Sequence, residues 1–101
     1  MLERKVLIID PEEDFCLYLQ YCLSKRNCIV DYSLDLSQGL TKIELTRPNV
    51  IVADINMEEN VEEKIENKSK EIKGYLPNVI LVDTETRAGN NLFDFIIKLF
   101  K

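Results

Sequence analysis

The 101-residue chain contains no histidine and no tryptophan, and it has only three cysteines, three glycines and three prolines. Without histidine it has no Ser-His-Asp or Cys-His nucleophile system, and it cannot donate a phosphoryl group from a phosphohistidine of its own. Zinc lacks plausible ligands, because Cys16, Cys22 and Cys28 have no CxxC spacing. We expect these cysteines to be buried or half-buried thiols in a reducing compartment.

Long hydrophobic runs are also absent. None approaches the roughly 20 residues that span a bilayer, and MLERKVLIID lacks the layout of a signal peptide. We therefore expect a cytoplasmic protein that does not enter a membrane. The formal net charge of −5 argues against direct binding of nucleic acid, which requires clustered Lys and Arg. The length and the 46% hydrophobic content predict a single domain, residues 1–101.

Short apolar runs alternate with helical patterns along the chain. We expect strands at 4–9, 28–32, 50–53, 79–82 and 93–97, and helices at 12–26, 33–46 and 58–73. Pro11 suits the first turn of the first helix with Asp10 as its N-cap, and Gly74 suits the C-cap of the third. This order predicts an α/β fold, a doubly wound five-stranded parallel sheet with helices on both faces.

Acidic residues follow several of the expected strands. Asp10 follows the first strand, Asp54 the third, Asp83 the fourth, and Lys98 follows the fifth. Ligands of doubly wound sheets bind at this edge. Carboxylates beside a lysine form a hard-oxygen site suited to Mg²⁺, at which an aspartate can attack a phosphoryl group and form an acyl phosphate. No glycine follows the first strand, so a glycine-rich cradle for a nucleotide is absent.

Four segments carry a resemblance to a known family: KVLIIDPEEDF, RPNVIVADINM, LPNVILVDT and FDFIIKLF. In this order and spacing, the chain resembles the receiver domains of bacterial two-component response regulators. The resemblance implies a flavodoxin-like strand order, 2-1-3-4-5, and a histidine kinase or phosphotransfer protein as partner. It implies a regulatory domain rather than an enzyme, one that at most catalyses its own phosphoryl transfer and dephosphorylation.

The resemblance also implies roles for individual residues. Asp54 matches the phosphoacceptor, Asp10 an acidic Mg²⁺ ligand, and Asn56 the residue whose backbone carbonyl completes the metal site. Lys98 matches the family's invariant lysine and Phe95 its aromatic switch position. Taken alone, Asp54 is as readily a helix N-cap or a loop-start acid, Lys98 a surface lysine, and Phe95 a core aromatic. The agreement among Asp54, Asp10, Asn56 and Lys98 favours a phosphoacceptor site.

Departures from the family pattern fall at both ends of the site. Pro11 stands where a second acid is usual, so Glu12 or Glu13 would have to replace that ligand. The switch Ser/Thr at the end of the fourth strand aligns with Asp83, and Thr84 comes one residue late. A carboxylate at the switch position would repel a phosphoryl group unless it is protonated or metal-bound.

The C-terminal part of the pattern is also shortened. Leu99 follows Lys98 where the family has proline, residues 83–91 leave room for only a turn or two of a fourth helix, and we expect no fifth helix. These losses favour a second function, a degenerate receiver that acts as an interaction or dimerisation module without phosphorylation. A third, an Mg²⁺-dependent phosphohydrolase, is disfavoured because no acid stands two residues after Asp54.

The first expected helix is apolar nearly all round, with residues Phe15, Cys16, Leu17, Tyr18, Leu19, Tyr21 and Cys22. Without a fifth helix, the neighbouring flank of the sheet would be uncovered, and an exposed apolar patch usually marks an interface. We expect another copy of the chain, as in a homodimer, a partner, or a further segment to cover it. The alternative is that this helix lies deep in the fold.

Overall fold

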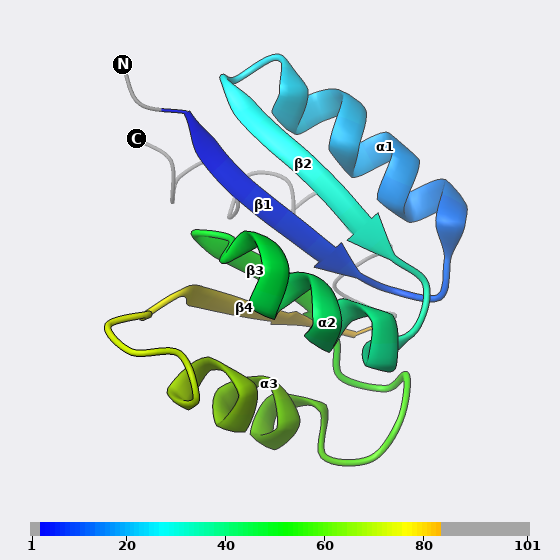
Figure 1. The fold of residues 1–101 in the computed structure, drawn as a ribbon. Helices are drawn as coiled ribbons and strands as arrows, with labels where there is room; N and C mark the ends of the chain where they lie inside the picture. Colours follow the sequence, from blue (N-terminus) through cyan, green and yellow to red (C-terminus); the bar gives the residue numbers. More distant parts are fainter. Residues whose placement is uncertain (1–2, 84–101) are drawn as a thin grey trace.

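The computed structural model describes residues 3–83, which form four strands and three helices (Figure 1). They follow one another as β1 (Arg4–Ile9), α1 (Glu13–Ser24), β2 (Cys28–Ser33), α2 (Leu36–Thr46), β3 (Val50–Asp54), α3 (Val61–Lys70) and β4 (Asn78–Val82). All seven of the elements expected here are confirmed, with boundaries that shift by a few residues. The strand expected at 93–97, the shortened fourth helix and the expected absence of a fifth lie outside the described residues.

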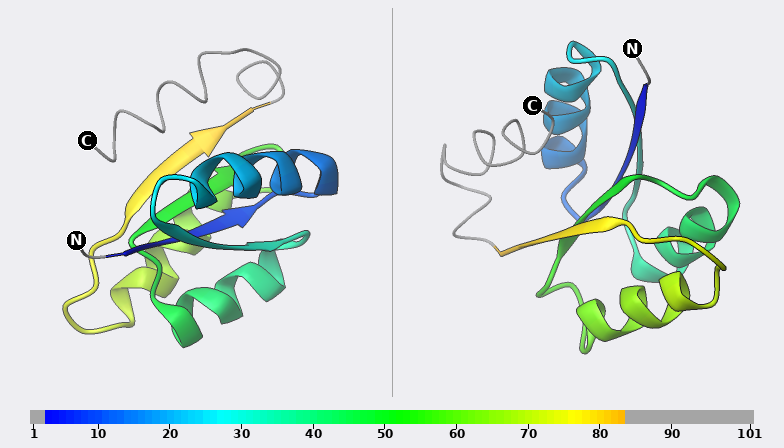
Figure 2. Two further views of the ribbon diagram at one scale, coloured as in Figure 1. Left: turned by 90° about the horizontal axis from the view of Figure 1, so that it is seen from above. Right: turned by 90° about the vertical axis from the view of Figure 1, so that its left-hand side faces the viewer.

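The four strands form one parallel sheet in the order β2-β1-β3-β4. Helix α1 lies on one face of this sheet, and α2 and α3 lie on the other (Figure 2). This is the predicted doubly wound, flavodoxin-like arrangement for the four strands described. No helix within residues 3–83 is long and apolar enough to cross a membrane.

The central strand β1 is buried on both faces. Val6 and Ile8 pack in the cluster beneath α1, and Leu7 and Ile9 pack in the cluster beneath α2 and α3. Each such side chain, when fully buried, contributes about 1.5–3 kcal/mol. Parallel strands covered by helices on both sides require apolar residues at every position, which explains the unbroken run at the end of β1.

Side chains close the outer edge of β2. The Gln20 amide donates to the Val30 carbonyl at 2.8 Å, and the Lys42 ammonium donates to the Tyr32 carbonyl at 2.7 Å. The Tyr32 N–H donates to the carboxylate of Asp31 at 2.8 Å. Because unpaired backbone groups at a sheet edge attract strands of other molecules, these bonds disfavour pairing along β2.

The start of α1 differs from the prediction. Its N-cap is Glu12, which is extended and makes no side-chain capping bond, and the helix begins at Glu13. Asp10 is therefore not the N-cap, and Pro11 lies before the first turn rather than in it. The reason is local: the residue before a proline favours extended backbone, and the Asp10 carboxylate accepts the Glu12 N–H at 2.9 Å instead of capping the helix.

Helix α1 is not buried all round, which speaks against the alternative that this helix lies deep in the fold. Cys16, Leu19 and Leu23 are buried, whereas Leu17, Tyr18 and Tyr21 are 45%, 61% and 63% exposed. The apolar residues on the outer side of α1 remain accessible in this chain. That a second copy, a partner or a further segment covers them stays a prediction.

The turn after α3 also differs from the prediction. The helix ends at Lys70 with Glu71 as its C-cap, and Gly74, expected as the cap, lies in the following turn with φ of +76°. Glycine adopts this left-handed conformation without steric cost. The turn leads into Tyr75, whose hydroxyl donates to the Pro48 carbonyl at 2.6 Å and ties the loop before β4 to the loop before β3.

We expect Tyr75→Phe to destabilise the domain by about 1 kcal/mol at neutral pH, because it removes this hydrogen bond. Burial raises the pKa of Tyr75 from its ordinary value of 10 to about 12. Its contribution to stability is therefore complete below pH 10 and is lost as the pH rises through 12. Urea unfolding across this range should show the wild type losing more stability than Tyr75→Phe. The exposed-hydroxyl control Tyr21→Phe should follow the wild type.

Gly39 allows α2 to approach β1 closely. A Cβ at this position would lie 2.7 Å from Cδ1 and 2.9 Å from Cγ1 of Ile9. Both residues are buried, and Ile9 is 0% exposed, so the isoleucine has no solvent-facing space to move into. Glycine here is a packing requirement, although it lowers helix propensity.

We expect Gly39→Ala to destabilise the domain by about 1 kcal/mol, because overpacking exceeds the propensity gained by removing glycine. Ile9→Val removes the Cδ1 atom that the new methyl group would meet. In a double-mutant cycle measured by chemical denaturation, Gly39→Ala should therefore cost less in the Ile9→Val background. Equal costs in both backgrounds would contradict this account.

Candidate functional site

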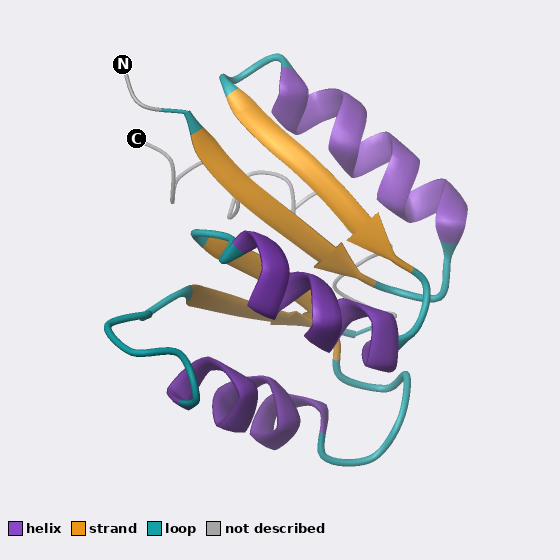
Figure 3. Ribbon diagram, in the orientation of Figure 1, coloured by secondary structure: helices purple, strands orange, loops and turns teal. Residues whose placement is uncertain are grey.

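Two buried aspartates lie at the carboxyl edge of the sheet. Asp10 is 0% exposed and Asp54 4% exposed. Strands β1 and β3 are neighbours in the sheet (Figure 3) and pair in parallel with Ile9 opposite Ala53. The next residues, Asp10 and Asp54, therefore stand side by side at the carboxyl edge. Acidic side chains are almost never so deeply buried unless they are paired or hydrogen-bonded. The apolar register of the two strands sets the position of these carboxylates.

Each aspartate holds the turn that follows it. The Asp10 Oδ1 accepts the Glu12 N–H at 2.9 Å, and the Asp54 Oδ1 accepts the Asn56 N–H at the same distance. Aspartate commonly bonds the backbone two residues on in this way. The two strand ends thus have matching local geometry, which fixes the orientation of both carboxylates.

The backbone at both aspartates is anchored to the neighbouring strand. The Asp10 N–H donates to the Ser33 carbonyl at 3.0 Å, and the Ile55 N–H, directly after Asp54, donates to the Val82 carbonyl at 2.9 Å. These bonds extend the sheet hydrogen bonding up to the site. The aspartates are therefore carried by rigid elements and not by a free loop.

The two structural alternatives for Asp54 can now be separated. Helix α3 begins at Val61, seven residues later in the chain, and its N-cap is Asn60. Asp54 is therefore not a helix cap, whereas its bond to the Asn56 N–H shows that it does organise the start of the loop. This structural role is compatible with a reactive carboxylate, and the chemical role stays a prediction.

The glutamates proposed to replace the missing second acid lie on the surface. Glu13 accepts the Tyr32 hydroxyl at 3.1 Å, and this bond raises the pKa of Tyr32. Glu12 is exposed. Within residues 3–83, no three Asp, Glu, Cys or His side chains form a metal-binding group, so neither glutamate completes a three-acid cluster there. Their part in metal binding stays a prediction.

Asp83 joins the same edge of the sheet. It directly follows β4, whose last residue, Val82, is opposite Asp54 in the register of the two strands. Asp83 is half-buried and stands one position beyond the Val82–Asp54 pair, at the same edge of the sheet. The other predicted site residues, Thr84, Phe95 and Lys98, lie outside the described residues.

Cys16 is a further contact of the site, beyond the residues predicted from the sequence. It is fully buried, and its thiol lies 3.5 Å from the Asp10 carbonyl, which it approaches as a donor. Cys28 is also buried and Cys22 half-buried, as expected for the three thiols. The helical spacing that places Cys16 with Leu19 and Leu23 on the inner side of α1 was the available signal.

The donor set of the site suits a hard cation. Asp10 and Asp54 provide carboxylate oxygens, and the backbone carbonyl of Asn56 is the third predicted ligand. Mg²⁺ is commonly held by one or two protein carboxylates and keeps several water molecules. The residues present therefore fit Mg²⁺, with fewer acids than a site that has a second carboxylate after β1.

Neither a family model nor a curated protein matches this sequence. Solved structures do match its fold. The signal receiver domain of a LuxO repressor protein from Vibrio parahaemolyticus has a TM-score of 0.75 and 10% identity, covering 98% of this chain and 90% of that chain. The receiver domain of NtrC4 from Aquifex aeolicus has a TM-score of 0.62 and 24% identity, with coverages of 84% and 74%.

A third match is the N-terminal domain of an uncharacterized protein from Wolinella succinogenes, with a TM-score of 0.68 and 25% identity, covering 95% of this chain and 73% of that chain. Together these similarities define the class of fold. The chain has the fold of response-regulator receiver domains, and the resemblance inferred from its sequence is confirmed at the level of the fold.

Proposed function

We propose that this domain accepts a phosphoryl group on Asp54 from a phosphohistidine of a histidine kinase or phosphotransfer protein, and that it signals through protein–protein contacts. One observation carries the proposal: Asp54 is buried beside Asp10 where two adjacent parallel strands end. A fold stabilised only by its core has no need of two carboxylates in this place, since burying them is unfavourable.

The proposed reaction is a phosphoryl transfer between two nucleophiles. A carboxylate oxygen of Asp54 attacks phosphorus, the phosphorus–nitrogen bond of the phosphohistidine breaks, and its electron pair stays on the imidazole, which then takes up a proton. The product on Asp54 is an acyl phosphate. Mg²⁺, when bound by Asp10, Asp54 and the Asn56 carbonyl, supplies positive charge against the phosphoryl oxygens. Lys98 is the proposed second cation.

The hydrogen bond from the Asn56 N–H to Asp54 Oδ1 orients the nucleophile in this reaction. It fixes the carboxylate before the phosphoryl donor arrives, so less freedom is lost in the transition state. The added phosphoryl group brings negative charge and new acceptor oxygens to this turn. Contacts of the loop after β3 are therefore the first to respond.

A degenerate receiver that works without phosphorylation is the second candidate. It is favoured by Pro11, which is exposed where a second acid is usual, and by Asp83, an acid that directly follows Val82, the strand partner of Asp54. The double substitution Pro11→Asp with Asp83→Thr restores the usual residues at both positions. If this variant takes up a phosphoryl group while the wild type does not, the second candidate is correct.

We expect acetyl phosphate with Mg²⁺ to add one phosphoryl group to the wild type, detected by intact-protein mass spectrometry. Asp54→Asn should abolish the addition, because the amide is a poor nucleophile. Asp14→Asn, which alters an exposed acid of α1, should be modified like the wild type. An unmodified wild type, or equal modification of Asp54→Asn, would rule out Asp54 as the acceptor.

Mg²⁺ binding can be tested without phosphorylation. A cation that binds only the folded state stabilises it, by about 2.7 kcal/mol at a concentration 100 times its Kd. We therefore expect Mg²⁺ to raise the Tm of the wild type and of Asp14→Asn, but to have little effect on Asp10→Asn. Equal shifts in Asp10→Asn and the wild type would place the cation elsewhere.

A further inference from the structure

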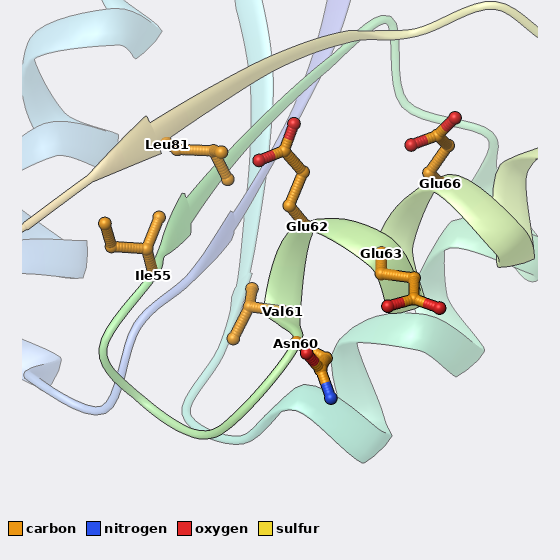
Figure 4. Close-up of a pocket in the computed structure, with 7 residues that line it drawn as sticks. All are labelled: Ile55, Asn60, Val61, Glu62, Glu63, Glu66 and Leu81. Carbon is orange, nitrogen blue, oxygen red and sulfur yellow. The ribbon is translucent and has the colours of Figure 1, made fainter.

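A groove runs along the side of α3 that borders β4. Two adjoining hollows of about 410 and 350 Å³ form it, and they share Glu62 and Glu66. The first extends to Ile55 and Leu81, and its lining is shown in Figure 4. The second extends past Val79 to the loop that enters β4. The groove therefore follows α3 along its length.

The groove has an apolar floor, formed by Ile55, Val79 and Leu81, and an apolar end at Leu76 in the loop before β4. Ile55, Val79 and Leu76 are 41%, 38% and 94% exposed, and Leu81 is half-buried. Val79 and Leu81 alternate along β4 and so lie on the same face of the sheet. Single exposed apolar residues are normal, but a contiguous set indicates an interaction surface.

The wall of the groove carries more acidic than basic side chains, although Lys70 also lines its second hollow. Glu62, Glu63 and Glu66 are exposed along α3, and within residues 3–83 only Glu66 has an ion-pair partner, Lys70 at 3.0 Å. Figure 4 shows the side chain of Glu62 between α3 and β4, near Leu81. On the side of α3 that faces α2, the Lys68 ammonium forms an ion pair with the Glu44 carboxylate, with 3.6 Å between Nζ and Oε2. The carboxylates are thus gathered on the groove side.

We propose that this groove binds an amphipathic helix of a partner protein, with an apolar stripe that packs on the floor and Lys or Arg residues that face Glu62 and Glu66. Helix α3 has 10 residues, and a groove of that length, ~15 Å, accommodates about three helical turns. Helices bind such grooves through apolar residues at three- and four-residue spacing. The acidic wall selects a basic helix and repels nucleic acid and anionic lipid.

This inference does not rest on phosphorylation of Asp54. It can be tested with a synthetic helical peptide of about 14 residues that carries leucine on one side and lysine on the other, and with an analogue in which glutamate replaces lysine. We expect the lysine peptide to bind, by fluorescence anisotropy, and to shift backbone amide NMR signals along α3 and β4. The glutamate peptide should not bind.

Two pairs of variants locate the binding. Glu62→Lys and Glu3→Lys change the net charge equally, but only the first lies in the groove, and we expect it alone to weaken binding about tenfold. Leu76→Ser and Leu45→Ser each remove an exposed leucine, 94% and 76% exposed, and only the first should weaken binding. All four sites are on the surface, so folding should be unaffected.

Three outcomes would overturn the proposal. The first is equal binding by both members of each pair, and the second is an NMR footprint away from α3 and β4. The third is self-association of the chain without peptide, measured by sedimentation and abolished by Leu76→Ser, which would assign the groove to a second copy. The proposal is supported if the lysine peptide binds the wild type and its binding is weakened in Glu62→Lys and Leu76→Ser but not in Glu3→Lys or Leu45→Ser.

Discussion

The parallel pairing of β1 with β3 is the constraint on which the rest of the described structure depends. It places Ile9 opposite Ala53, with both side chains in the core beneath α2 and α3. A slip of one residue would turn every side chain of a strand to the other face, so apolar packing holds the register. The same register brings Asp10 beside Asp54. Core packing and site assembly are therefore consequences of one pairing.

Much of this could be predicted from the sequence, because the strands are apolar on both faces and stand out from amphipathic helices. The rule that ligand sites lie beyond the carboxyl ends of parallel strands then selected Asp10 and Asp54. Their burial and adjacency agree with that selection. The rule does not predict the structural role of each carboxylate, because the sequence around Asp54 is equally compatible with a helix cap and with a turn.

The errors at the helix ends share a physical cause. Aspartate and glycine are both common at helix caps, but side chains and turns can satisfy the backbone in more than one way. Asp10 bonds the Glu12 N–H before α1 begins, and Gly74 serves the turn after α3 instead of its end. The groove cannot be predicted from the sequence for a related reason. The charge run of α3 indicates a solvated face, and only the fold shows that its acids border β4.

The turn after β3 connects the aspartate site to the groove between α3 and β4. Asp54 accepts the Asn56 N–H, and Ile55, between them, lines the groove and bonds the Val82 carbonyl through its own N–H. An influence of the site on the groove would have a direct route through Ile55, which follows Asp54 in the chain and lines the groove. Contact alone does not couple the site to the groove. Coupling requires that the turn has a second conformation, and that a ligand of the site or of the groove favours one of the two conformations. The hydrogen bond at Asp54 Oδ1 is the contact that a group added to this carboxylate would alter first.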